Sequence, residues 1–184
     1  RWQVTGLENL PDGPFILASK HQSFFDTVVW SQLIPNAAYV MKEELLSQPI
    51  FGWFIRHIDV VALDRKAGLS SLKKLLVDSQ AKADQGLPVV IFPEGTRTRP
   101  GERGRYHPGV AAMYEKLNLP VVPVGTDSGV FWDRGLKGLK QGVITVAIQP
   151  AIQPGLDKRA FLTEVSECIE TSSLSLFEQA QIAG

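Results

Sequence analysis

The chain has 184 residues, of which 44% are hydrophobic and 21% are charged, enough to bury one sizeable core, so we expect one domain over residues 1–184. Nineteen basic residues balance nineteen acidic ones, which excludes the overall positive field that attracts nucleic acid, so no nucleic-acid partner is expected. The single cysteine excludes an intrachain disulfide and favours a reducing compartment.

Short apolar runs alternate with runs of helical periodicity along the chain. Strands are predicted at 15–18, 37–41, 59–63, 89–92, 120–125 and 143–148, the last as an edge strand. Helices are predicted at 27–34, 69–84, 110–117 and about 161–176, and loops at 100–109 and 126–141. Because strands alternate with helices through the first two thirds of the chain, we predict an α/β fold with a mainly parallel sheet and helices on both faces.

Two of the predicted helices carry a stripe of residues that should face the core. In the helix at 69–84 the stripe is Leu69, Leu72, Leu75, Leu76 and Ser79. In the last helix it is Phe161, Val165, Cys168 or Ile169, Ser172 and Leu176. Since Cys168 falls on this stripe, we interpret it as a small core residue and not as a nucleophile.

The sequence holds no apolar run near the ~18 to 20 residues of a membrane span, and no signal-peptide pattern opens it. The chain begins with arginine and not with methionine, so we expect that an N-terminal membrane segment is missing from it. The aromatic stretch at 43–57 has two interpretations. It packs in the core, or it forms a surface that dips into a bilayer or lines an acyl groove.

His21 and Asp26 stand five residues apart, directly after the strand at 15–18. On one helix, positions five apart point about 140° away from each other. Contact therefore requires His21 on the turn that leaves the strand and Asp26 in the first turns of the next helix. Both would then lie at the carboxyl end of a strand, where open α/β sheets place their sites. A histidine whose ring is held by a carboxylate is a general base.

Such a base needs a hydroxyl to deprotonate. Within the chain the candidate is Ser23, which would make the protein a serine hydrolase, but there is no GxSxG elbow and a serine two residues from its base is badly placed for attack. The alternative is a hydroxyl carried by the substrate. A module that only binds lipid is a third possibility. No metal site is expected, because the three histidines form no HExxH motif or helical pair.

Arginines follow two of the predicted strands: Arg65 after one, and Arg97 and Arg99 after another. Guanidinium groups that converge at strand ends recognise phosphate through paired, charge-assisted hydrogen bonds. The sequence has no GxxxxGK[ST] and no GxGxxG, so a small phosphorylated ligand is favoured over a nucleotide. Further contacts at the second strand end could come from Thr96, the backbone N–H groups around Gly95, and Glu94 as an acceptor.

Four blocks of the sequence resemble those of the glycerolipid acyltransferase family. The segment from His21 to Asp26 resembles the HxxxxD block, and Phe92 to Thr98 resembles the FPEGTRS block. The stretch at 52–65 resembles the block whose arginine holds the acceptor phosphate, and 121–124 resembles the fourth, apolar block. The four blocks occur in the family's order over about residues 15–126, and the nearest likeness is to the bacterial 1-acyl-sn-glycerol-3-phosphate acyltransferases.

This resemblance implies a fold like that of glycerol-3-phosphate acyltransferase. It implies acylation of the 2-hydroxyl of lysophosphatidic acid from acyl-CoA or acyl carrier protein, without a further cofactor, at the cytoplasmic face of the bacterial inner membrane. His21 would be the base and Asp26 the residue that orients it. Roles in binding substrate are implied for Lys42, Arg65, Glu94, Gly95 and Arg97.

The sequence departs from the family's pattern at two positions. Lys20 stands where many members have asparagine, and a cation there would either lower the imidazole pKa or add to phosphate binding. Thr98 replaces the usual serine and keeps a hydroxyl. Within the same family, an enzyme that acylates another lysolipid, such as a lyso-ornithine lipid, is the alternative to the lysophosphatidate enzyme.

Overall fold

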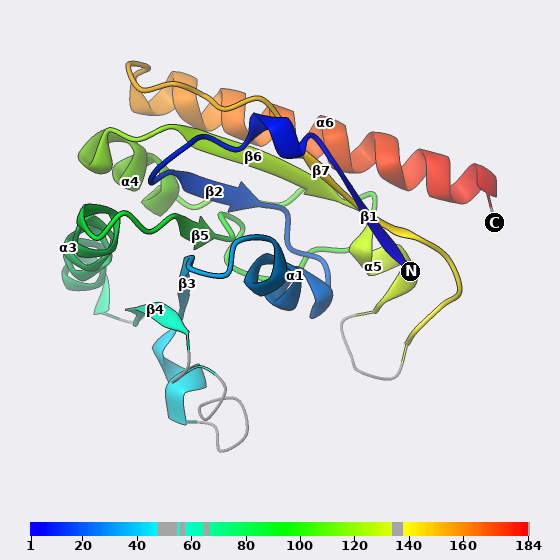
Figure 1. Cartoon of the computed structure of the whole chain (residues 1–184), viewed down its shortest axis with the longest axis horizontal. Coiled ribbons are helices and arrows are strands. Elements are labelled where there is room, and N and C mark those ends of the chain that lie inside the picture. Colours follow the sequence, from blue (N-terminus) through cyan, green and yellow to red (C-terminus); the bar gives the residue numbers. More distant parts are fainter. Residues whose placement is uncertain (48–54, 56–57, 65–66, 134–137, 184) are drawn as a thin grey trace.

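The computed structural model describes residues 1–47, 55, 58–64, 67–133 and 138–183. Strands in these residues form one seven-stranded sheet in the order β1-β7-β6-β2-β5-β3-β4 (Figure 1). The strands are β1 Trp2–Thr5, β2 Ile16–Ser19, β3 Ala38–Lys42, β4 Asp59–Leu63, β5 Val89–Ile91, β6 Val121–Thr126 and β7 Ile144–Ile148. β2, the first strand of the predicted core, therefore lies at the centre of the sheet.

The sheet is mainly parallel, as predicted. β2 pairs in parallel with both β5 and β6, and β3 pairs in parallel with β4 and β5. β7 runs antiparallel to β6. The prediction that 143–148 is an edge strand is wrong, because β1 pairs with β7 from Trp2 to Thr5 and takes the edge instead. β1 is short and mostly exposed, so it lacks the apolar pattern that would have identified it.

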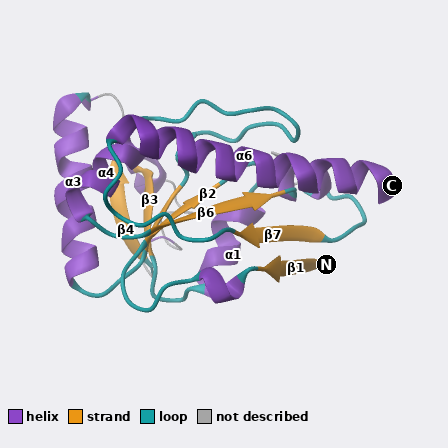
Figure 2. Ribbon diagram, turned by 90° about the horizontal axis from the view of Figure 1, so that it is seen from above, coloured by secondary structure: helices purple, strands orange, loops and turns teal. Residues whose placement is uncertain are grey.

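Helices cover both faces of the sheet, as predicted. The helices of the described residues are α1 Phe25–Leu33, α3 Leu69–Asp84, α4 Gly109–Leu117, α5 Ser128–Phe131 and α6 Lys158–Ala183, with 3₁₀ turns at Leu7–Asn9 and Glu43–Ser47. Along β2, Ile16 and Ala18 pack in one core cluster with residues of α3, α4 and α6, whereas Leu17 packs in the other with residues of α1. Figure 2 shows α6 running across the sheet above β6. None of these helices is long and apolar enough to cross a bilayer.

Three details differ from the sequence-based expectations. The buried stripe of α3 is Ser71, Leu75, Ser79 and Ala83, so Leu75 and Ser79 of the predicted stripe are buried, whereas Leu69 is 86% exposed. In α6 the core position is Ile169, and Cys168 beside it is only partly buried. The predicted loop at 126–141 contains the short helix α5.

The aromatic stretch at 43–57 falls mostly outside the described residues. Its first part is the 3₁₀ turn Glu43–Ser47, and Ile55 is buried at 1% exposure. Neither the packing interpretation nor the membrane interpretation of its other residues is tested.

Candidate active site

The loops that follow β2 and β5 meet at the middle of one edge of the sheet. β2 ends at Ser19 and α1 begins at Phe25, so the intervening turn carries His21. β5 ends at Ile91 and leads into the loop at 92–99. Because β2 and β5 are parallel neighbours, both loops leave the sheet from its carboxyl edge. The predicted strand–turn–helix geometry is therefore present.

His21 and Asp26 are in contact. Nδ1 of His21 lies 3.3 Å from Oδ2 of Asp26, and the same oxygen accepts the backbone N–H groups of Gln22 at 2.6 Å and Ser23 at 2.8 Å. Asp26 is 2% exposed, while the His21 side chain is 14% exposed. When Nδ1 carries the ring proton and donates it to Asp26, the lone pair is on Nε2, which is the arrangement of a general base.

Phe92 holds the imidazole from one face. The two rings are stacked, with centroids 4.2 Å apart and planes inclined by 25°. Asp26 fixes the ring edge and Phe92 the ring plane, so the orientation of the base is set from two directions. Sequence reasoning assigned no role to Phe92, although it occupies the first position of the loop that follows β5.

Glu94 lies behind the histidine and faces the protein interior. It is 2% exposed; Oε2 accepts the backbone N–H of His21 at 2.9 Å, and Oε1 accepts the hydroxyl of Thr98 at 2.9 Å. Burial raises the pKa of Glu94, and the ammonium of Lys20, 2.7 Å from Oε1, opposes that rise. With these partners the carboxylate positions the turn at 20–24, which carries His21. Because Glu94 is buried and bonded to His21, the geometry favours a supporting role for Glu94 over direct contact with the substrate.

The two interpretations of Lys20 can now be separated in part. Its side chain is 1% exposed, and Nζ lies 2.7 Å from Glu94 and 2.8 Å from Glu170 of α6. An ammonium enclosed by two carboxylates is not available to a phosphate, so phosphate binding by Lys20 is wrong.

The loop after β5 is tied to the histidine by its backbone. Thr98 donates its N–H to the carbonyl of His21 at 2.8 Å. Gly95 has a φ of +65°, in the left-handed region that favours glycine, and its N–H closes a turn on the carbonyl of Phe92 at 2.9 Å. Thr96 is exposed and Arg97 is partly buried on this loop.

The remaining predicted ligands lie farther away or outside the described residues. Lys42 ends β3 and is exposed. Ala38 and Ile16 both align with Val89, so Lys42 stands level with Lys20 but two strands away, about 10 Å across the sheet. Arg65 lies outside the described residues. The structure thus brings together the residues of two blocks, 21–26 and 94–98.

Two further polar residues at this edge were missed by sequence reasoning. Gln22 accepts the N–H of Gly129 at 3.0 Å, which joins the turn that carries His21 to α5. Asp127 follows β6, is 4% exposed and accepts the N–H of Thr145 at 2.7 Å. Burial, with a smaller contribution from the charge of Asp26, raises the pKa of Asp127 to about 6. The sequence signal for both residues was that each follows a buried strand: Gln22 comes after β2 and Asp127 after β6.

Ser23 is buried and stabilises the turn. It is 0% exposed, and its Oγ accepts the N–H of Phe25 at 3.1 Å. We expect Ser23→Ala to keep kcat within about threefold and to lower the free energy of unfolding by about 0.5–2 kcal/mol, as for a lost helix cap. Turnover assays and thermal melts would check this. If turnover fell much more than the amount of folded protein, the hypothesis that Ser23 is a nucleophile would again be supported.

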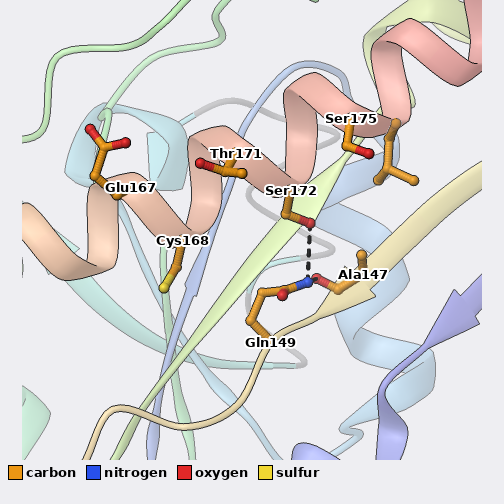
Figure 3. A pocket seen from close by; sticks show the side chains of 8 residues that line it. Ala147, Gln149, Glu167, Cys168, Thr171, Ser172 and Ser175 are labelled. Atoms are coloured by element: carbon orange, nitrogen blue, oxygen red, sulfur yellow. Dashed lines mark hydrogen bonds between the residues drawn. The ribbon is translucent and has the colours of Figure 1, made fainter.

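A cavity of about 570 Å³ lies between α6 and β7. Figure 3 shows its lining, with a hydrogen bond of 3.1 Å from Gln149 to Ser172, and Cys168 among the side chains. Burial raises the pKa of the Cys168 thiol, which disfavours the nucleophilic thiolate. In the part of the chain that the structure describes, no group of three or more His, Cys, Asp or Glu residues gathers to hold a metal ion.

The chain is similar to known acyltransferases in sequence and in fold. The model of the family described as Acyltransferase matches residues 1–127. The chain is 36% identical over 152 residues to a 1-acyl-sn-glycerol-3-phosphate acyltransferase of Pseudomonas aeruginosa, covering 83% of this chain and 59% of that protein. It is 31% identical over 156 residues to the chloroplastic 1-acyl-sn-glycerol-3-phosphate acyltransferase BAT2 of Brassica napus, covering 81% of this chain and 44% of that protein. The chain spans about half the length of the curated relatives it matches.

A solved structure confirms the expected fold. The crystal structure of the 1-acyl-sn-glycerophosphate (LPA) acyltransferase PlsC from Thermotoga maritima superposes with a TM-score of 0.78 at 25% identity, over 94% of this chain and 70% of that one. The family match covers both loops that build the site, and the fold match covers nearly the whole chain. The chain therefore belongs to the acyltransferase family.

Proposed function

We propose that this chain carries the catalytic site of a 1-acyl-sn-glycerol-3-phosphate O-acyltransferase. It transfers a fatty acyl group from acyl-CoA or acyl carrier protein to the 2-hydroxyl of lysophosphatidic acid and forms phosphatidic acid. The observation that carries the proposal is the contact of 3.3 Å between His21 and Asp26, beside the loop of Glu94 to Thr98. The names of the relatives support the choice of substrate.

In the proposed reaction, Nε2 of His21 takes the proton of the acceptor 2-hydroxyl while its oxygen attacks the thioester carbonyl. The resulting imidazolium is stabilised by Asp26. The tetrahedral intermediate collapses, the C–S bond breaks, and the imidazolium returns its proton to the leaving thiolate. Every proton is accounted for by one histidine, so the reaction needs no covalent enzyme intermediate and no cofactor besides the acyl thioester.

The acceptor is a membrane lipid, so we place the reaction at a membrane surface, at the cytoplasmic face of the bacterial inner membrane. The acyl donors are soluble thioesters and reach the site from the water side. The choice between acyl-CoA and acyl carrier protein belongs to the same proposal and is read out by supplying each donor in turn.

Arg97 is proposed to hold the acceptor phosphate, together with Lys42 and with Arg65, which lies outside the described residues. Because one of several cationic contacts is lost, we expect Arg97→Ala to raise KM for lysophosphatidic acid about tenfold and to change kcat little. Arg99→Ala is the matched control, since the Arg99 side chain is 73% exposed and lies 3.9 Å from Glu102. Equal effects of the two variants would contradict the assignment.

A panel of lysolipids tests the function itself. Purified protein is given acyl-CoA or acyl carrier protein and each acceptor in turn, and thiol release is followed. Lysophosphatidic acid should give the largest kcat/KM. An acceptor without phosphate that outperforms it would replace the proposal by acylation of another lysolipid, such as a lyso-ornithine lipid. Thiol release with no acceptor would indicate a hydrolase, and none with any acceptor would indicate a module that only binds.

A further inference from the structure

We infer that Glu170, on α6, is a positioning residue for acyl transfer: it holds Lys20 against Glu94 and thereby fixes the turn that carries His21. The inference rests on the proposed function. Glu170 lies beyond residue 127, where the family match ends, and its partner Lys20 is 150 positions away in the chain. No local pattern in the sequence pointed to it.

The contacts form an unbroken path from α6 to the histidine. Both carboxylate oxygens of Glu170 lie within hydrogen-bond distance of Nζ of Lys20, at 2.8 and 2.9 Å. The same nitrogen lies 2.7 Å from Oε1 of Glu94, whose Oε2 accepts the backbone N–H of His21 at 2.9 Å. A displacement of the Glu170 carboxylate therefore reaches the catalytic turn through two charged contacts.

The ammonium of Lys20 has a complete set of acceptors. It has three N–H donors, and its acceptors are Glu94, Glu170 and the backbone carbonyl of Glu102 at 3.2 Å. Lys20 is only 1% exposed, so its ammonium lies away from the bulk water that satisfies donors at the surface. Loss of the Glu170 carboxylate would leave one donor without its charged partner and remove one of the three contacts that fix Nζ, so the position of Nζ against Glu94 would be less restrained.

The loop at 102–106 holds the Glu170 carboxylate from the other side. Tyr106 donates its hydroxyl to Oε1 at 3.0 Å, and Gly104 donates its N–H to the same oxygen at 3.3 Å. Burial and the charge of Glu170 raise the pKa of Tyr106, so it stays a neutral donor. A Cβ at Gly104 would collide with the Glu94 carboxylate, so the backbone closes directly over this buried cluster.

Buried ion pairs are weak contributors to stability, since the cost of desolvation offsets much of the attraction. The cluster has one ammonium and two carboxylates, so the two carboxylates also repel each other, and we do not expect the cluster to add much to the free energy of unfolding. The cluster acts on position instead: Glu170 restrains Lys20, and Lys20 restrains Glu94. Glu94 in turn restrains the backbone of His21, the proposed base. We therefore place the effect of Glu170 on kcat and not on substrate binding.

Glu170→Gln tests the inference, because it keeps the size and an acceptor oxygen but removes the charge. We expect kcat per folded molecule to fall about tenfold, with KM for donor and acceptor unchanged within about twofold. Glu167→Gln is the matched control: Glu167 lies one helical turn earlier on α6, is 54% exposed and pairs with Arg103 at 2.7 Å. It should leave kcat at the wild-type level. An unchanged kcat in Glu170→Gln, or an equal fall in both variants, would overturn the inference.

A double-variant cycle tests the path. If Glu170 acts through Glu94, adding Glu170→Gln to Glu94→Gln should lower kcat by much less than tenfold further, because the route is already broken. Two independent, multiplying effects would refute that route. Should Glu170→Gln not fold, Tyr106→Phe removes a single hydrogen bond from the same carboxylate. It should lower kcat two- to threefold at unchanged KM; wild-type kcat would count against the inference.

A readout without turnover separates this inference from the proposed function. The amide proton and nitrogen chemical shifts of His21 report its hydrogen bond to Glu94. We expect them to change in Glu170→Gln and to stay unchanged in Glu167→Gln. Unchanged chemical shifts in both variants would overturn the role of Glu170. If the wild-type protein acylated no acceptor, the proposed function would be overturned, and the chemical shifts would still show whether Glu170 positions the turn of His21.

Discussion

We expect His21→Ala to lower kcat for acyl transfer by about 10²- to 10⁴-fold, the range of a lost general base. The substitution removes the one imidazole that Asp26 and Phe92 orient at the carboxyl edge of the sheet. The side chain is only 14% exposed and stacks on Phe92, so its loss also removes packing, and the melting temperature should fall by several degrees without loss of the fold. Release of thiol from the acyl donor, normalised to folded protein, measures the change.

His107→Ala is the control for this variant. His107 is exposed on the loop before α4, and it donates its backbone N–H to the carbonyl of Pro93, which alanine keeps. It should turn over like the wild type. A His21→Ala variant that kept a tenth or more of wild-type kcat would contradict the role of His21 as the base and with it the proposed mechanism.

The geometry around His21 could be predicted because it depends on local rules. A strand ends, a helix starts within a few residues, and a spacing of five cannot bring two side chains together on one helix. Only the strand–turn–helix arrangement satisfies a contact, and the structure has it. The same holds for α3 and β4, whose bounds agree with the apolar and polar pattern of the sequence.

The support of the site could not be predicted, because it depends on contacts between distant parts of the chain. The sequence left two interpretations of Lys20 open, and only the packing of α6 on the sheet shows that its ammonium pairs with Glu170 as well as Glu94. Glu94 is a second case. A carboxylate next to a glycine in a loop suggests a substrate ligand, but the carboxylate of Glu94 points inward, toward His21 and Lys20. The edge position of β1 was missed for the same reason, because β1 pairs with β7, a strand about 140 residues away in the chain.

The second large effect is expected for Asp26→Asn, which should lower kcat about 10²-fold. Oδ2 of Asp26 accepts two backbone N–H groups as well as contacting the ring. An amide oxygen can take its place and keep both backbone bonds, so the turn should survive. What the amide lacks is the negative charge that stabilises the imidazolium as the proton is transferred. The loss should therefore appear in kcat and not in KM or in folding.

Asp26→Ala separates this catalytic role from the structural one. Alanine removes the acceptor of the N–H groups of Gln22 and Ser23, both buried, and each unpaired donor costs about 1–3 kcal/mol. We expect a clear fall in melting temperature for Asp26→Ala and almost none for Asp26→Asn, with kcat low in both. If Asp26→Asn turned over at the wild-type rate, the carboxylate would serve only to shape the turn, and His21 would act as a base without a charged partner.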